Sequence, residues 1–174
     1  MGRVVWLVAI VSGLGLVTRY ANSAGASGRP PAVWPVDSKV ARTPGLPTLL
    51  LFVHPHCPCS RATIGELAVL MARTQGLVNT NVVFVRPAGF PENWEKTDLW
   101  NSAVNIPGVS VMVDDNGLEA GRFRSLTSGQ ATFYSADGRL LFNGGITGSR
   151  GHSGDNAGRS AIVSLLTAGT AERK

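Results

Sequence analysis

The chain has 174 residues, a formal net charge of +5 and a hydrophobic content of 44%. This length suits one domain with a short appendage, and this hydrophobic content excludes a disordered chain. The basic residues are scattered and form no run interleaved with aromatic residues, so a nucleic-acid partner is not expected. Two cysteines separated by one residue exclude a secreted scaffold held by many disulfides.

Residues 1–21 are predicted to form a signal peptide or a membrane anchor. Residues 4–17 carry no charge, and this run is shorter than the roughly 20 residues of a full membrane span. Its length also suits the core of a signal peptide, and the small residues at 24–26 offer a cleavage site. Arg19, close behind the run, favours retention as an anchor instead. Either alternative places the rest of the chain outside the cytoplasm, in an oxidising compartment.

An extended linker is predicted over residues 22–47, which are rich in Ser, Gly, Ala and Pro. Trp34 within it is expected to anchor the linker on the folded domain. That domain is predicted to extend over residues 48–166, and residues 167–174 are expected to form a frayed tail.

Strands and helices alternate along the predicted domain. The apolar run 49–53 is typical of a buried strand, and the apolar residues that follow it recur with helical spacing up to about Gly76. The further predicted elements are a strand at 82–85, a helix at 92–104, a strand at 109–113, a short helix at 118–123, strands at 130–135 and 139–142, and a helix at 156–166. The first strand, helix and strand imply a right-handed parallel crossover, and Asp137-Gly138 predicts a hairpin. The predicted fold class is α/β.

Both cysteines and two of the three histidines lie in the turn His54-Pro-His-Cys-Pro-Cys59, between the first strand and the first domain helix. The unpaired N–H groups and the dipole of a helix N-terminus stabilise a nearby thiolate. Pro58 suits the first helical turn because its missing N–H would have no partner there. Arg61 and a protonated histidine would add electrostatic support. The turn therefore predicts reversible thiol exchange.

Metal binding is the alternative chemistry of the same turn. His54, Cys57 and Cys59 offer soft or borderline ligands within six residues, a set suitable for copper(I). Against this alternative, the adjacent His56 and Cys57 do not easily share one ion, and zinc signatures separate their ligands into pairs. In a third alternative the histidines form only local hydrogen bonds, and both cysteines stay reduced and buried.

The order of elements and several motifs resemble the thioredoxin-like superfamily, and more narrowly the bacterial membrane-tethered proteins of the TlpA and RedB type. The motifs are Phe52-Val-His-Pro-His-Cys-Pro-Cys-Ser-Arg-Ala62, Thr127-Ser-Gly-Gln130, Phe142-Asn-Gly-Gly-Ile-Thr147 and Arg150-Gly-His-Ser-Gly-Asp-Asn156. The resemblance covers residues 34–166. It implies a thioredoxin-like three-layer sandwich with a central mixed β-sheet, preceded by a hydrophobic N-terminal helix.

The resemblance also implies a protein thiol–disulfide oxidoreductase whose redox-active disulfide needs no further cofactor. Cys57 would be the nucleophile, as the first cysteine is in thioredoxins, and Cys59 the resolving thiol. The supporting residues would be His56, Pro58, Arg61 and Gln130. The implied partners are protein thiols and disulfides, and a bacterial inner membrane that holds the domain in the periplasm. A disulfide ring this small is strained, and strain raises the reduction potential, so we expect a potential above that of thioredoxin.

The sequence departs from thioredoxins at two places. Thioredoxins carry two residues between their cysteines, whereas Pro58 stands alone here. They also carry a cis-proline before the strand that faces the active site, where this chain has Gln130-Ala131. Substrate docking beside that strand is therefore left open. The alternative functions are a copper-binding metallochaperone and a non-catalytic binding module.

Overall fold

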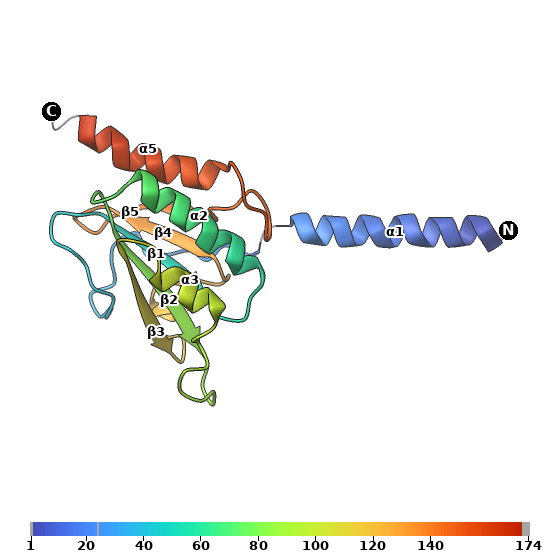
Figure 1. Cartoon of the computed structure of the whole chain (residues 1–174), viewed down its shortest axis with the longest axis horizontal. Coiled ribbons are helices and arrows are strands. Elements are labelled where there is room, and N and C mark those ends of the chain that lie inside the picture. Colours follow the sequence, from blue (N-terminus) through green and yellow to red (C-terminus); the bar gives the residue numbers. More distant parts are fainter. Residues whose placement is uncertain (1, 24, 172–174) are drawn as a thin grey trace.

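Five strands form one mixed sheet at the centre of the domain (Figure 1). The computed structural model describes residues 2–23 and 25–171. The strands are β1 (Thr48–Val53), β2 (Asn79–Arg86), β3 (Val109–Asp115), β4 (Gln130–Tyr134) and β5 (Leu140–Gly144), and their order across the sheet is β3-β2-β1-β4-β5. β1 pairs in parallel with β2 and β2 with β3, whereas β4 is antiparallel to both β1 and β5. The parallel crossover and the hairpin are both confirmed.

Helices cover both faces of this sheet. The helices are α1 (Gly2–Asn22), α2 (Cys59–Arg73), α3 (Asp98–Val104), α4 (Leu118–Arg122) and α5 (Ala157–Ala171). The core of one face joins α2, α3 and α5 to side chains such as Leu49 and Leu51 of β1. On the other face, Phe123 and the linker residues Trp34 and Val40 pack against Leu50 and Phe52. The three-layer α/β fold class is therefore confirmed.

The central strand β1 is buried along its whole length. Each of its six residues is buried, because both faces of the strand are covered and both edges are paired. The sequence of a strand in that position is a continuous apolar run rather than an alternation of apolar and polar residues. Its carboxyl end leads directly into the cysteine turn, so a fully buried central strand positions the thiols.

Two helix predictions need correction. The helix expected over 92–104 begins only at Asp98. Asn93 adopts a left-handed φ of 68°, which a right-handed helix does not accommodate, and two successive turns occupy the residues before α3. The last helix continues past 166 to Ala171, because no proline interrupts its hydrogen-bond ladder, so the tail predicted from 167 is helical that far. Residues 172–174 lie outside the described part of the chain.

The linker packs on the domain, and we call residues 25–47 the strap. Trp34 packs edge-on against Phe123 and Tyr134, with ring centroids 4.9 and 5.2 Å away. Val33 forms an isolated antiparallel bridge with Arg139. The predicted anchoring role of Trp34 is thus confirmed, and its partners are aromatic rings on the sheet face opposite α2.

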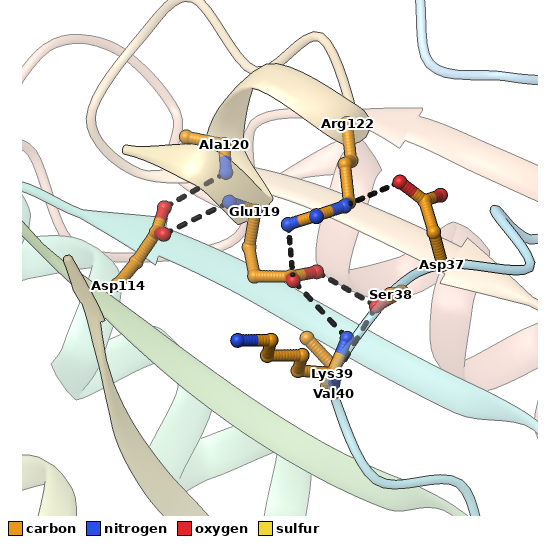
Figure 2. Close-up of polar contacts among 8 residues, drawn as sticks. All are labelled: Asp37, Ser38, Lys39, Val40, Asp114, Glu119, Ala120 and Arg122. Atoms are coloured by element: carbon orange, nitrogen blue, oxygen red, sulfur yellow. Dashed lines mark hydrogen bonds and ion pairs between the residues drawn. The ribbon is translucent and has the colours of Figure 1, made fainter. Parts of the chain in front are cut away.

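A buried carboxylate fixes the strap further along (Figure 2). Glu119 of α4 is 3% exposed and accepts hydrogen bonds from the Ser38 hydroxyl at 2.7 Å and the Lys39 N–H at 3.1 Å. Arg122 donates to the same carboxylate at 2.9 Å and to Asp37 at 2.8 Å. Because the charge of Glu119 is compensated by a guanidinium and by polar donors, its burial here is tolerated.

Asp114 holds the start of α4 in the same region (Figure 2). Its carboxylate accepts the backbone N–H groups of Glu119 and Ala120, each at 2.8 Å, and so satisfies two donors that a helix N-terminus leaves unpaired. Burial raises the pKa of Asp114, although these hydrogen bonds oppose the shift. The turn before α4 closes at Gly117, whose φ of +67° is adopted by glycine without strain.

The helix α1 projects away from the domain (Figure 1), and none of its 21 residues is buried. It is long and apolar enough to cross a membrane by length and composition. At 1.5 Å per residue it measures about 32 Å, close to the roughly 30 Å of a hydrocarbon core. The charge-free run 4–17 is therefore only the middle of a longer helix.

Candidate functional site

The cysteine turn joins the end of β1 to the start of α2. The Cys57 N–H donates to the His54 carbonyl and the Ser60 N–H to the Cys57 carbonyl, both at 3.1 Å. Pro58 has helical torsions, φ −59° and ψ −32°, directly before the first residue of α2. Both cysteines are free thiols and both are half-buried. The predicted position of the pair, at the mouth of a helix, is the one the structure has.

The thiol of Cys57 is the more acidic of the two. Burial by itself raises the pKa of Cys57, but hydrogen bonds from the Ser60 hydroxyl, from the N–H groups of Cys59 and Ser60 and from the Cys59 thiol outweigh it. The resulting pKa is lower than that of an ordinary cysteine. Two of these donors are the first N–H groups of α2, which have no partner inside the helix.

The pKa of the Cys59 thiol is shifted in the opposite direction. Burial raises the pKa of Cys59, and the negative charge on Cys57 together with their mutual hydrogen bond raises it further. Arg150 opposes this shift through its positive charge. Gly151 lies against this cysteine, since a Cβ on Gly151 would stand 3.8 Å from the Cys59 Cα. The two thiols therefore ionise in a fixed order, with Cys57 first.

Two serine hydroxyls extend the support of Cys57. Ser128 accepts the His54 N–H at 2.7 Å, and its hydroxyl lies 2.7 Å from that of Ser60. Because Ser128 already accepts one hydrogen bond, its own proton can go to Ser60, and the Ser60 proton is then free to bind the Cys57 thiolate. Neither serine was predicted as a site residue, although both lie inside motifs that carry the resemblance.

The two histidines make local contacts. His54 accepts the His56 N–H on its Nδ1 at 3.3 Å, and burial together with the charge of His56 lowers the pKa of His54. His56 donates from Nε2 to the Trp94 carbonyl at 3.1 Å and packs on the Trp94 ring at a centroid distance of 4.5 Å. The Phe90 ring also packs against the Trp94 ring, with a centroid distance of 4.4 Å. The rim beside the thiols is thus aromatic.

Arg61 makes a different contact from the expected one. Its guanidinium pairs with Asp98 at the start of α3, and both side chains are well exposed. The guanidinium that acts on a cysteine is that of Arg150, from the glycine-rich loop after β5. Arg150 begins one of the quoted motifs, but no local signal connects it with the cysteine turn, because about 90 residues separate the two.

Gln130 organises the start of β4 beside the thiols. Its buried side-chain oxygen accepts the N–H groups of Gly28 at 3.2 Å and Leu126 at 3.1 Å, and its amide nitrogen donates to Asn143 at 2.8 Å. The Asn143 amide donates in turn to the Gly28 carbonyl at 2.8 Å. Where thioredoxins carry a cis-proline, this chain therefore has an amide clamp that binds its own strap.

A groove of about 840 Å³ opens beside the cysteines. Its lining comes from the segment that precedes β4, from the glycine-rich loop 144–151 and from the start of α5. The residues that line it before the domain begins are Asn22, Gly25 and Ser27. The groove is thus bounded on one side by the chain that leaves α1.

No group of three His, Cys, Asp or Glu side chains that could hold a metal ion occurs among residues 2–23 and 25–171. The copper alternative needs His54 to face the two cysteines. In the structure its Nδ1 is engaged by the His56 N–H, and the His56 ring faces Trp94.

Comparison with solved structures identifies the fold. An uncharacterized conserved protein from Geobacillus kaustophilus superposes with a TM-score of 0.60 at 19% identity, over 84% of this chain and 81% of that one. DsbF of MTB, solved in mixed oxidized and reduced forms, gives 0.52 at 15% identity over 72% and 81%. A putative thioredoxin from Neisseria meningitidis gives 0.50 at 15% identity over 73% and 77%. The chain has the thioredoxin-like fold, as its resemblance implied.

No protein-family model matches the chain, and neither does any curated protein.

Proposed function

We propose that the chain is a thiol–disulfide oxidoreductase held on the outer face of a bacterial inner membrane, with Cys57 as nucleophile and Cys59 as resolving thiol. The observation that carries this proposal is the inequality of the two thiols at the mouth of α2. The pKa of Cys57 is lowered whereas that of Cys59 is raised. Only a thiolate attacks a disulfide, so this inequality selects which sulfur reacts first.

In the first step the Cys57 thiolate attacks one sulfur of a substrate disulfide. A bond forms between Cys57 Sγ and that sulfur while the substrate S–S bond breaks, and the second substrate sulfur leaves as a thiolate that takes up a proton from water. The negative charge of Cys57 is lost in the mixed disulfide. One cause of the raised pKa of Cys59 disappears with it, so Cys59 ionises more easily once its partner has reacted.

In the second step the Cys59 sulfur, having lost its proton to water, attacks Cys57 Sγ. The Cys57–Cys59 disulfide forms, the mixed disulfide breaks, and the substrate leaves with its second thiol. Two electrons and two protons have then passed from the protein to the substrate. The same steps in reverse oxidise a substrate dithiol.

The membrane placement rests on α1. Its length matches a hydrocarbon core, and the 21 residues include Arg3 and Arg19 near its two ends, where charged groups reach the headgroups. An anchored domain that follows such a helix works in the oxidising compartment where protein disulfides form.

Trapping tests the proposed chemistry. The Cys59→Ser variant should retain substrate proteins as mixed disulfides on Cys57, because the sulfur that releases them is missing. Non-reducing gels of membrane extracts, followed by release with dithiothreitol, measure the retained species. Cys57→Ser is the matched control and should retain nothing. The proposal is wrong if Cys59→Ser retains nothing and the wild-type pair cannot be cycled by dithiothreitol.

Cys57→Ser, together with His54→Ala, also distinguishes the oxidoreductase from two alternative functions. A copper-binding chaperone would hold one equivalent of copper(I) after anaerobic reconstitution, and both His54→Ala and Cys57→Ser would lose it. A non-catalytic binding module would bind its partner equally well in Cys57→Ser. Neither result is expected from an enzyme whose two sulfurs exchange disulfides.

A further inference from the structure

We propose that the cysteine groove faces the surface of the membrane that α1 crosses, and that its substrate is an extended, cysteine-bearing segment of an integral membrane protein close to that surface. This inference rests on the proposed function, since it needs both thiol exchange and a retained α1. It adds the location and the class of the substrate.

The connection from α1 to the domain is short. The helix ends at Asn22, and four residues later the carbonyl of Ala26 accepts the Thr127 hydroxyl at 2.6 Å. Gly28 is then held through both its N–H and its carbonyl by the amide clamp. Four residues span at most about 14 Å. The domain therefore has little freedom to turn its groove away from the end of the helix.

The glycine-rich loop itself touches the end of α1. The Arg150 guanidinium lies over the Tyr20 ring, 5.0 Å from its centroid. Asn22, two residues further, is part of the groove lining together with Cys57 and Cys59. Figure 1 shows the N-terminal ends of α2 and α5 turned toward α1. These contacts direct the reactive end of the domain, rather than its opposite end, toward the helix.

The position of α1 in the bilayer determines how far the groove lies above the membrane. A helix of about 32 Å uses its whole length on the hydrocarbon core, so Tyr20 and Asn22 lie at the headgroups. Tyrosine and arginine are the residues that favour this layer. The headgroup layer adds only about 5–7 Å on each side, so a groove lined by Asn22 opens at or just above it. A reacting sulfur must therefore come close to the membrane.

The lining of the groove favours a polypeptide as the occupant. It is formed largely by glycines, small hydroxyl side chains and amides, which present backbone donors and acceptors to an extended chain. Gly145 leaves open space, since nothing lies within 4 Å of a Cβ built there. Among the described residues that line it, Leu126 is the only large apolar side chain, whereas a lipid-soluble carrier would need several.

Exchange with membrane-anchored peptides tests the inference. The full chain is placed in nanodiscs with single-span peptides whose fluorescent disulfide stands 4, 12 or 24 residues above the membrane, and the soluble peptide serves as reference. We expect the lowest disulfide to be reduced about tenfold faster than the highest, because effective concentration falls steeply with tether length.

A matched variant carries a flexible insertion of 20 Gly and Ser residues after Asn22. The insertion leaves the domain and the clamp at Gly28 intact but separates Tyr20 and Asn22 from the groove, so each rate with an anchored peptide is divided by the rate of the same variant with the soluble peptide. It removes the short connection, and so the preference for the lowest disulfide should disappear. A wild-type rate that is equal at all heights, or highest for the tallest peptide, would overturn the membrane-facing groove while exchange itself persists. Failure to reduce every peptide, the soluble one included, would instead overturn the proposed function and this inference with it.

Discussion

The strap is attached to the domain in two chemically different ways. Around Glu119 it is held by a buried carboxylate, a guanidinium and charge-assisted hydrogen bonds (Figure 2). Around Gln130 it is held by neutral groups alone, which are amides and the hydroxyl of Thr127. Charge-assisted bonds are about twice as strong as neutral ones, but a carboxylate near a thiol disfavours the thiolate. The stronger lock lies away from the cysteines, and the clamp at the groove adds no charge beside Cys57.

The largest effect on stability is expected from Glu119→Ala. Removal of this buried carboxylate leaves the Ser38 hydroxyl and the Lys39 N–H without their acceptor, and it leaves Arg122 with Asp37 alone. We expect a loss of about 3 kcal/mol in the free energy of unfolding, measured by urea titration. Exchange of a soluble disulfide by the folded variant should be unchanged. A loss of exchange without a loss of stability would break the comparison, because it would couple this lock to the thiols.

A smaller loss of stability is expected from Gln130→Ala, with a change in exchange as well. The variant removes the three neutral hydrogen bonds of the Gln130 side chain. Alanine is smaller than glutamine, so water can enter the space and bind the freed backbone groups. We expect a loss of about 1–2 kcal/mol in unfolding free energy. Because the strap wall of the groove is released, reduction of the disulfide peptide should slow several-fold. Gln130→Glu sharpens the comparison, since it places a charge at the clamp and should raise the pKa of Cys57, read from the pH dependence of thiol alkylation.

The smallest effect is expected from Asp98→Ala. The Arg61–Asp98 pair is exposed on both sides, so water replaces each partner readily. Neither the urea midpoint nor the pH profile of Cys57 alkylation should move measurably. A shift of that profile would show that Arg61 acts on the thiolate after all, as its position in the sequence suggested.

The sequence predicts the parts of the molecule that are set by short-range patterns. The apolar run of β1, the helical spacing after Cys59 and the Asp-Gly turn each depend on a few adjacent residues. The position of the thiol pair follows from the same local pattern. Even Trp34 could be predicted as an anchor, because a lone aromatic residue in a polar linker has few other uses.

Contacts between distant segments were not predictable in the same way. Ser128 and Arg150 reach the cysteine turn only because β4 pairs with β1 and the glycine-rich loop folds over α2. Arg61 was assigned to the thiols because it is their neighbour in sequence, but Asp98 offers it an opposite charge. The helix prediction from 92 was wrong for a local reason, since Asn93 adopts the left-handed region, which asparagine enters more readily than most residues.

The amide clamp joins positions 102 and 115 residues apart in the chain, from Gly28 to Gln130 and from Gly28 to Asn143. Contacts between such remote positions form late, because a long loop must close before they are made. The cysteine turn is synthesised well before the strands that complete its surroundings. In a newly made chain the two thiols therefore lack the serine, arginine and groove contacts of the finished fold until β4 and β5 have joined the sheet.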